Sequence, residues 1–565
     1  MLETQILIVG AGPVGQMAAL LLARQGVSSI IVERRLERMT APKAHAVNSR
    51  TLEICEAAGL SAESMRATGA PADEAGWVRF VSTLTGTEFG HLPYERQQDD
   101  VKDLTPFPLS NIAQPDFEAL LEAKLKETDL VTLLRGGECI SVDETVDHVV
   151  GTIAFSDERT EKIKSRYVFA ADGANSRLRS ALGIELEGPE GLQHNMMIHF
   201  EADLRTFVKD KPGILYFLFE PDAQGALIAY DLGKTWVLMH SFDPATTTPD
   251  TFDDATCIAL VEKAVGAALP DIKIKNAGPW SMCAQVAERY RQGRVFLIGD
   301  AAHRFPPTGG LGLNTGVGDA QNIAWKIAAV ENGWADPRLL DTYEDERRPV
   351  AQTNTEQSLE NSAKLFELFA ALYGSDPEQT RRHFDAISKD PASNSDLAAA
   401  IEIQRPHFDS LNLQLGYRYT SDAVLDPAAI DQDAPLDISQ YLPSTQTGAV
   451  LPHQWVKRQG EVVSILSLLP MDRFVLLTGP DGGGWAERLR AVDLPVSLIV
   501  DGLNFETDYA WTTYTGLPDQ GALLIRPDRH IAQRYKATCP AQQLRDDLTS
   551  LLSQTITEVA HGARA

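Results

Sequence analysis

The 565-residue sequence has few cysteines and a deficit of positive charge. Its 51 lysine and arginine residues against 78 aspartate and glutamate residues give a formal charge of −27. Nucleic acids and anionic membrane surfaces bind through basic patches, so this balance argues against either partner. The five cysteines are scattered and form no CxxC pair. They indicate a reducing compartment and neither a disulfide framework nor a zinc site.

Long apolar runs are also missing. No segment approaches the length of a membrane span, and the first apolar stretch is a predicted strand, not the core of a signal peptide. We therefore expect a soluble, cytoplasmic protein. The sequence has no internal repeat and no cluster of metal ligands, so we expect no bound metal. At this length one hydrophobic core does not suffice, and two or three domains are expected.

A glycine-rich turn lies close to the N-terminus. The apolar run 6–9 precedes Gly10-Ala11-Gly12-Pro13-Val14-Gly15, and a second apolar run follows. This order predicts a strand, a tight turn and a helix whose N-terminal N–H groups face an anion. Gly10 permits the turn, Gly12 lets the backbone approach phosphates, and Gly15 lets the helix pack against the strand. A second strand, 29–32, ends at Glu33, where a ribose-binding acid is expected. The segment predicts a dinucleotide site.

The remaining sequence predicts an α/β fold in which an antiparallel sheet interrupts the buried parallel strands. Strands are expected at 131–134, 149–155 and 167–171, the last followed by Asp172-Gly173. Alternating apolar residues between 195 and 242 predict an antiparallel sheet inserted into the nucleotide-binding domain. A buried strand at 295–298 leads to Gly299-Asp300, which places an acid at the carboxyl end of the sheet, where ligands bind.

With these three motifs in this order, the chain resembles the class A FAD-dependent monooxygenases over its whole length. These are the aromatic hydroxylases related to p-hydroxybenzoate hydroxylase and phenol hydroxylase, and the style is that of phenol and chlorophenol hydroxylases. The resemblance implies that Asp300 bonds the ribityl chain of FAD and that Asp172 serves both FAD and the nicotinamide cofactor. The resemblance also implies that Arg50 and Gln114 contact FAD. From the sequence without this resemblance, we would expect Arg50 to form a surface salt bridge.

The loop after Asp300 completes the predicted cofactor site. Its glycines let the backbone reach the isoalloxazine face, and a helix N-terminus near Leu313-Asn314 stabilises negative charge on the reduced ring. His303 is expected to support the phosphate loop. The predicted FAD-binding residues are Gly10, Gly12, Pro13, Val14, Gly15, Glu33, Arg34, Arg50, Gln114, Asp172, Gly299, Asp300, Pro307, Gly310, Gly312, Leu313 and Asn314.

The resemblance also implies the reaction. The sequence shows no metal-ligand cluster, so the flavin itself must activate O2, and no second glycine fingerprint, so NADPH or NADH docks transiently, reduces FAD and leaves. Reduced FAD then takes up oxygen to give a C4a-hydroperoxide with an electrophilic distal oxygen. A phenol attacks best as phenolate, so the site should help to remove the phenolic proton.

His45 is the candidate for this proton transfer. An aspartate follows a similar Arg-Ala pair in phenol hydroxylase-like members, and chlorophenol hydroxylase-like relatives carry histidine there. Histidine titrates near neutrality and accepts or relays a proton; the alternative is a histidine that only packs beside the flavin. Tyr230 and Trp280 are candidates for lining the aromatic pocket, and core packing is their alternative role.

The domain boundaries follow from these assignments. Residues 1–180 and 276–400 are expected to form a discontinuous Rossmann-like FAD-binding domain, with 181–275 as the substrate-binding sheet domain. A linker, 401–435, leads to a thioredoxin-like α/β domain, 436–565, which matches the family at 448–453 and 524–528. Without a CxxC pair this domain cannot exchange disulfides, and it is expected to support a homodimer or higher oligomer.

Two other readings stay open. A flavin monooxygenase of this type can instead carry out epoxidation, Baeyer–Villiger oxidation or halogenation, although the tryptophan-rich signature of flavin halogenases is absent. A non-catalytic binding protein on a flavoprotein fold is the alternative from another class. The sequence does not identify the aromatic substrate, nor does it distinguish NADPH from NADH.

Overall fold

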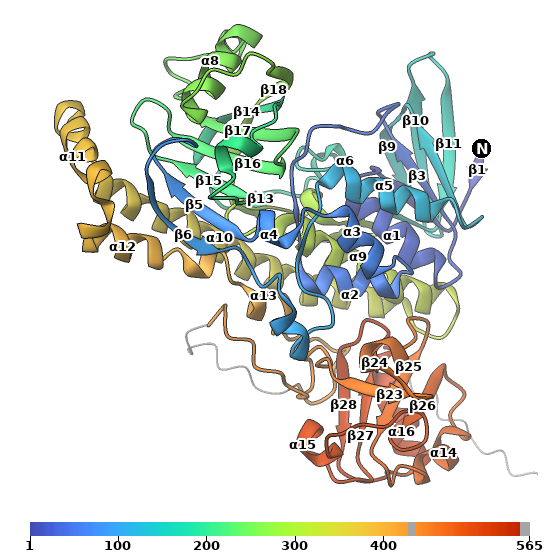
Figure 1. Ribbon diagram of the computed structural model, residues 1–565. Coiled ribbons are helices and arrows are strands. Elements are labelled where there is room, and N and C mark those ends of the chain that lie inside the picture. Colours follow the sequence, from blue (N-terminus) through green and yellow to red (C-terminus); the bar gives the residue numbers. More distant parts are fainter. Residues whose placement is uncertain (428–436, 554–565) are drawn as a thin grey trace, which may run out of the picture.

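The computed structural model describes residues 1–427 and 437–553 (Figure 1). Of the predicted linker, residues 428–435 lie outside the described residues, as do residues 554–565 of the predicted C-terminal domain. The architecture is mixed α/β, as expected. Among the described residues no helix is both long and apolar enough to cross a bilayer, and all five cysteines are buried and free.

The first half of the chain is built around a six-stranded sheet. Its strands, in spatial order, are β20 (Arg291–Gln292), β21 (Val295–Leu297), β12 (Tyr167–Ala170), β2 (Ile6–Val9), β3 (Ser29–Glu33) and β8 (Val131–Arg135). All run parallel except the edge strand β20. Parallel strands that are covered on both faces are apolar throughout, and β2 is completely buried. The strands predicted from apolar runs in this part of the sequence are confirmed.

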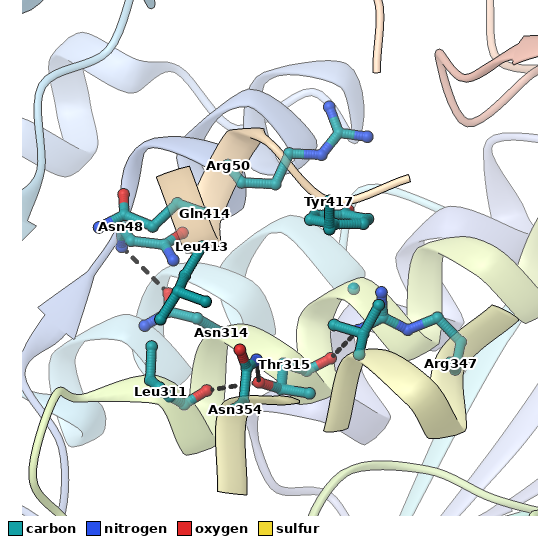
Figure 2. Close-up of a pocket in the computed structure, with 12 residues that line it drawn as sticks. Asn48, Arg50, Leu311, Asn314, Thr315, Arg347, Asn354, Leu413, Gln414 and Tyr417 are labelled. Carbon is teal, nitrogen blue, oxygen red and sulfur yellow. Dashed lines mark hydrogen bonds between the residues drawn. The ribbon is translucent and has the colours of Figure 1, made fainter. Parts of the chain in front are cut away.

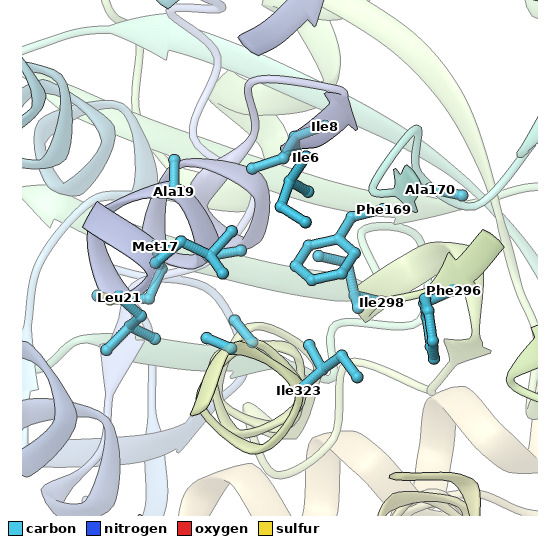
Figure 3. Close-up of a cluster of buried hydrophobic side chains, with 14 of the residues drawn as sticks. Ile6, Ile8, Met17, Ala19, Leu21, Phe169, Ala170, Phe296, Ile298 and Ile323 are labelled. Atoms are coloured by element: carbon cyan, nitrogen blue, oxygen red, sulfur yellow. The ribbon is translucent and has the colours of Figure 1, made fainter. Parts of the chain in front are cut away.

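Two layers cover this sheet. Helices α1 (Pro13–Ala23) and α9 (Leu311–Glu331) lie on one face, where Met17 and Ile323 pack toward Ile8 and Phe169 (Figure 3). On the other face, a β-carbon added to Gly151 would lie 2.5 Å from a methyl group of Leu7. Gly151 belongs to a second sheet, whose strands are β1 (Leu2–Glu3), β11 (Thr160–Ser165), β10 (Val149–Phe155) and β9 (Gly137–Glu144).

A separate seven-stranded sheet, drawn in green and blue in Figure 1, forms the second large sheet of the chain. Its strands are β18 (Lys273–Met282), β14 (Gln193–Glu201), β17 (Thr235–Ser241), β16 (Gly225–Asp231), β15 (Leu215–Leu218), β5 (Trp77–Val81) and β6 (Glu88–Pro93). The boundaries 181–275 are too narrow for this sheet, because β5 and β6 precede them and β18 crosses them. β5 pairs in parallel with β15, and no local pattern reveals a pairing between segments so distant in sequence.

Helices cover both faces of the seven-stranded sheet. α8 (Asp254–Val265) packs on one face around Trp236. On the other face, Phe80 and Phe89 pack with residues of α10 (Thr342–Leu372), α11 (Pro377–Lys389) and α12 (Ser395–Glu402). Residues 377–400 therefore pack on the seven-stranded sheet, whereas we predicted that they belong to the domain of the six-stranded parallel sheet. Their polar composition hides the few apolar residues that make this contact.

The other α-helices and strands before the C-terminal part are mostly short. They are α2 (Ser49–Ala57), α3 (Ala62–Thr68), α4 (Ala72–Ala75), α5 (Gln114–Leu125), α6 (Arg177–Ala181), α7 (Arg205–Val208), α13 (Leu411–Leu415), β4 (Ala46–Val47), β7 (Ser110–Asn111), β13 (Leu186–Glu187), β19 (Gln285–Ala287) and β22 (His303–Arg304). Asn48 caps α2 by accepting a hydrogen bond from the Thr51 N–H group, the usual role of asparagine at this position.

The C-terminal part is a separate four-stranded sheet, drawn in orange and red in Figure 1. Its strands are β26 (Val496–Val500), β25 (Phe474–Thr478), β27 (Ala522–Ile525) and β28 (Ile531–Tyr535), with the helices α14 (Gly484–Leu489), α15 (Trp511–Thr515) and α16 (Ala541–Leu551) and the hairpin β23 (Trp455–Arg458) and β24 (Glu461–Ser464). The part is mixed α/β, as predicted. Phe474 and Leu476 pack against Trp325 of α9, so this sheet shares a core with the first half.

Candidate active site

The glycine turn brings α1 very close to β2. Gly10 has a φ of +111°, and a β-carbon there would lie 2.2 Å from the Ala171 carbonyl oxygen. A β-carbon on Gly15 would lie 2.1 Å from the Gly10 carbonyl oxygen. At Gly12, the N-cap of α1, an added β-carbon would meet nothing within 4 Å. Gly10 and Gly15 thus permit the close packing of α1 on β2, and Gly12 leaves open space before the N-terminus of α1.

Glu33 closes this turn from the end of β3. Its carboxylate accepts hydrogen bonds from the backbone N–H of Ala11 at 2.9 Å and of Arg35 at 3.0 Å. Pro13 and Val14 begin α1 beside it, whereas Arg34 is exposed. The predicted acid is therefore in contact with the glycine turn.

Two further acids reach the same edge of the sheet. β12 lies between β2 and β21, so Asp172 and Asp300 follow neighbouring parallel strands. Asp172 accepts a hydrogen bond from the Leu178 N–H group through Oδ2, while its buried Oδ1 has no partner. The side chain of Asp300 is exposed to the open space before the sheet edge. Desolvation by the protein around it raises the pKa of its carboxyl group.

Lys43 is a member of this group that the sequence reading missed. Its charge acts on the carboxyl groups of both Asp300 and Glu118, favouring their ionised forms. Lys43 lies in an irregular stretch directly before His45, where no periodic pattern marks it. A cation at this place is suited to neutralise a phosphate near the glycine turn.

The N-terminus of α9 opens toward the same space. The helix begins at Leu311, two residues before the predicted start, because Gly310 with a φ of +63° is its N-cap. A β-carbon on Gly312 would meet nothing within 4 Å, while Leu313 is half-buried and Pro307 is exposed. The first turn of α9 thus combines open space with unpaired backbone N–H groups.

Asn314 anchors this helix rather than extending into the open space. Its Nδ2 donates to the carbonyl oxygens of Ala46 and Gly310, and its Oδ1 accepts from Asn48 N and Thr51 Oγ1. These four bonds occupy the whole amide. The side chain of Asn314 therefore has no free donor or acceptor for a ligand.

A buried ion network supports the loop from below. Asp319 of α9 accepts from Gly299 N at 3.1 Å, lies 2.8 Å from His303 Nε2 and pairs with Arg347 Nε at 2.8 Å. Arg347 also donates to the Thr315 carbonyl oxygen (Figure 2). His303 thus lies in the supporting position that the sequence suggested.

Arg50 and Gln114 make contacts of other kinds. Arg50 is buried and donates to Glu53, to Gln321 and to the Asp528 carbonyl oxygen. Figure 2 shows its guanidinium group pointing away from Asn314, at the rim of a cavity of about 30 Å³. The Gln114 amide donates to Glu118 at 2.8 Å. None of these described bonds joins either side chain to the glycine turn.

His45 lies in an aromatic and amide cluster. It precedes β4, which pairs with β7, and its Nδ1 is 2.8 Å from Asn111 Oδ1. Its ring centroid is 5.6 Å from that of Tyr94 and 5.8 Å from that of Tyr230. Burial lowers the pKa of His45, and the Asn111 bond opposes this shift in part. The lowered pKa favours the neutral form of His45, which can accept a proton.

Tyr230 reaches His45 from the seven-stranded sheet. It lies in β16 at a β-bulge between Ala229 and Asp231, a feature that redirects side chains. Leu227 and Ala229 face the α8 core, so the alternate residue Tyr230 faces away from α8. It also lines a cavity of about 320 Å³ between residues 68–75 and the end of β16.

Trp280 lies far from this cluster. It pairs with Asn195, which pairs with Ser241 at the end of β17, whereas β16 reaches the start of β17 near Tyr230. Six residues of strand separate the two positions, roughly 20 Å. Both residues were candidates for lining one aromatic pocket, but the strand register places them at different ends of the sheet. The structure thus brings Tyr230 to His45 and leaves Trp280 at the opposite end.

Comparisons with known proteins cover nearly the whole chain. The FAD binding domain family matches residues 3–358, and the family "Aromatic-ring hydroxylase, C-terminal" matches residues 444–555. The chain is 31% identical over 586 residues to 2,4-dichlorophenol 6-monooxygenase of Cupriavidus pinatubonensis, covering 98% of this chain and 96% of the relative. It is 33% identical over 586 residues to tetracenomycin A2 monooxygenase-dioxygenase of Streptomyces glaucescens, with 98% and 97% covered.

A solved structure agrees with the fold. The flavin-dependent monooxygenase PieE in complex with FAD and substrate superposes with a TM-score of 0.91 at 31% identity, covering 98% of this chain and all of that one. The residues described here fit FAD: Gly12 and Gly312 leave the open space, and Asp172 Oδ1 is a buried acceptor without a partner. The chain therefore belongs to the FAD-dependent aromatic-ring hydroxylases, the class A flavin monooxygenases, and is itself a monooxygenase with FAD as its cofactor.

Proposed function

We propose that the enzyme hydroxylates a phenol whose hydroxyl group lies against His45 Nε2. The observation that carries this proposal is the position of His45, which has Nδ1 bound by Asn111 and lies beside Tyr94 and Tyr230. Nε2 is then the ring nitrogen available to a ligand. Tyr94 and Tyr230 offer edge and face contacts to an aromatic ring bound beside His45.

The proposed binding mode for FAD uses both halves of the first sheet. The N-terminus of α1 at Gly12 would hold the pyrophosphate, with Lys43 as its counter-charge, and Glu33 and Asp300 would bind hydroxyl groups of the two sugar parts. The N-terminus of α9 at Gly312 would hold the flavin ring, and the dipole of this helix would stabilise negative charge on it. Arg50 and Gln114 contribute indirectly, by holding α2 and α5.

The chemistry divides between the cofactor and the protein. FAD, reduced by NADPH or NADH, activates O2 when bound. The protein holds the phenol beside Tyr94 and Tyr230 and accepts the phenolic proton at His45 Nε2. Removing that proton makes the ring carbons more nucleophilic, so proton transfer and oxygen transfer favour each other.

The substrate class is tested with a panel of phenols. 2,4-Dichlorophenol, the substrate named for one relative, and a polycyclic phenol such as tetracenomycin A2 are added to the FAD-loaded enzyme with NADPH or NADH. We expect at least one to accelerate cofactor oxidation and to give hydroxylated product in equal amount. Hydrogen peroxide without product for every phenol would contradict the proposal, and an epoxide or ester product would favour the other oxidations.

The pH profile provides a second prediction. The pKa of His45 lies below its ordinary value of 6.5, so the neutral base is present above that pKa and is lost as the pH falls through it. For a phenol that stays un-ionised in this range, we expect kcat/KM to fall on the acid side with a midpoint below 6.5. A midpoint above 6.5, or an unchanged profile in the His45→Ala variant, would exclude His45 as the base.

A third prediction concerns FAD binding at Gly12. Gly12→Val needs no backbone change, because Gly12 has a φ of −69° and an added β-carbon meets nothing. The valine fills the space proposed for the pyrophosphate and should cost about 1–3 kcal/mol, which is about 5- to 150-fold in the FAD dissociation constant. Flavin fluorescence on titration of the apoprotein measures it.

Gly483→Val is the matched control for this change. Gly483 is likewise a helix N-cap, with a φ of −55° and open space where a β-carbon would be, but it precedes α14 in the C-terminal part. We expect its FAD affinity to equal that of the wild type. Equal affinity in both variants would place the pyrophosphate elsewhere.

The domain plan is also proposed in a revised form. The C-terminal sheet has the order β26-β25-β27-β28, with β25 and β26 parallel and β27 antiparallel to β25. Together with α14, α15 and α16 between and after the strands, this order supports a thioredoxin-like domain. As the resemblance implies, we expect it to contact a second copy of the chain, which the molecular mass in solution tests.

A further inference from the structure

The orientation of one buried amide is fixed by the backbone. Gln97 is 4% exposed, and its Nε2 donates to the carbonyl oxygens of Ala75 at 3.0 Å and Tyr94 at 2.7 Å. Carbonyl oxygens only accept hydrogen bonds, so the NH2 group of Gln97 must face them. Its Oε1 therefore has to face the other way.

This orientation passes to Asn111. Gln97 Oε1 accepts a hydrogen bond from Asn111 Nδ2 at 3.0 Å, and Asn111 is 3% exposed. Because its NH2 group is directed to Gln97, Asn111 presents Oδ1 to His45, 2.8 Å from Nδ1. The flipped Asn111 amide would set its Oδ1 against Gln97 Oε1, two acceptors without a hydrogen between them, and is excluded.

An amide oxygen accepts only, so the proton of neutral His45 has to be on Nδ1. A neutral imidazole carries one proton, and its lone pair is then on Nε2. Free histidine favours the opposite tautomer, with the proton on Nε2. We propose that Gln97 and Asn111 are positioning residues that fix the tautomer of His45 and so keep Nε2 ready to accept the phenolic proton. This inference rests on the proposed role of His45.

The proton balance is simple. The phenolic O–H bond breaks and an Nε2–H bond forms, which leaves a phenolate and an imidazolium ion; Nε2 returns the proton to solvent after product leaves. The ionisable groups that face His45 are Tyr94 and Tyr230, and burial raises the pKa of both, so both stay neutral. The relay thus fixes the tautomer without a charge.

The test compares two buried glutamines. Gln97→Met removes the donors that orient the relay. The matched control is Gln404→Met, because Gln404 is also buried and donates to two backbone carbonyl oxygens, those of Lys364 and Ala400, while its Oε1 holds no partner. We expect Gln97→Met to lower kcat for an un-ionised phenol about tenfold or more and Gln404→Met to leave it unchanged.

A second measurement does not depend on turnover. 4-Nitrocatechol bound to the oxidised FAD enzyme reports its own ionisation by visible absorbance, and we expect its apparent pKa to rise in Gln97→Met and Asn111→Leu but not in Gln404→Met. Asn111→Asp places a carboxylate beside Nδ1, which favours the imidazolium ion. The acid side of the pH profile should then move up by about one unit or more.

The outcomes separate the two proposals. If Gln97→Met and Asn111→Leu match Gln404→Met in both measurements while His45→Ala loses activity, the tautomer relay is wrong and the base assignment stands. If His45→Ala is also fully active, the proposed function of His45 fails. An unmoved acid side in Asn111→Asp would likewise overturn the relay.

Discussion

His45→Ala is expected to lower the rate of phenol hydroxylation by about 10²- to 10⁴-fold, the usual contribution of a general base. FAD should stay bound, because His45 contacts Asn111 and two tyrosines rather than the glycine turn. Without the base the phenol remains protonated, and NAD(P)H consumption should continue with release of hydrogen peroxide. Single-turnover product yield and peroxide assays measure both effects.

The acidity of the substrate provides an internal control. A nitrophenol that is already ionised in solution should lose much less rate in His45→Ala than an un-ionised phenol. His194→Ala is the matched variant, because His194 is also half-buried with Nδ1 bonded to one side chain, Ser281, but it lies at the β14–β18 end of the sheet. Equal losses for both phenols would show that His45 acts by shape and not by taking a proton.

Arg526→Met is expected to have the largest effect on stability. Arg526 is fully buried between Glu346 of α10, at 2.5 and 2.8 Å, and Asp528, at 2.6 and 3.0 Å. Lys326 also pairs with Glu346 at 2.7 Å, so two cations balance two carboxylates. Removing one partner leaves a buried charge uncompensated, which costs about 3–5 kcal/mol.

Thermal unfolding with flavin fluorescence measures this cost. A loss of that size lowers the midpoint by about 6–20 °C in a domain of 150–250 residues, and adding Glu346→Gln should restore part of it. The control is Arg473→Met, since Arg473 pairs with Asp472 on the surface of the same C-terminal part and such changes stay within about 0.5 kcal/mol. Equal midpoints for the two single variants would show that the cluster adds nothing.

Local patterns predicted the elements that carry the cofactor. A strand of four apolar residues, three glycines and an acid at the next strand end are short-range signals, and the structure has them in contact through Ala11 and Glu33. Asp172 and Asp300 were predictable for a similar reason, because the carboxyl ends of parallel strands share one edge.

Features set by distant pairings were not predictable. β5 joins the seven-stranded sheet through β15, and Asn111 meets His45 only because β7 pairs with β4. Register along β14 and β17 separated Trp280 from Tyr230. Arg50, assigned to FAD by resemblance, donates to Asp528 near the other end of the chain, and no motif announces such a partner.

The turn between β27 and β28 is synthesised late, but its residues bond to parts of the chain that are synthesised much earlier. Arg526 pairs with Glu346, 180 residues earlier, and Arg529 donates to the Glu53 carbonyl oxygen, 476 residues earlier. At a synthesis rate of about 5–20 residues per second, Arg526 is added to the chain roughly 10 to 35 seconds after Glu346. A nascent chain that stops short of this turn has only Lys326 as the buried cation beside Glu346, so the ion cluster is completed only when synthesis is nearly finished.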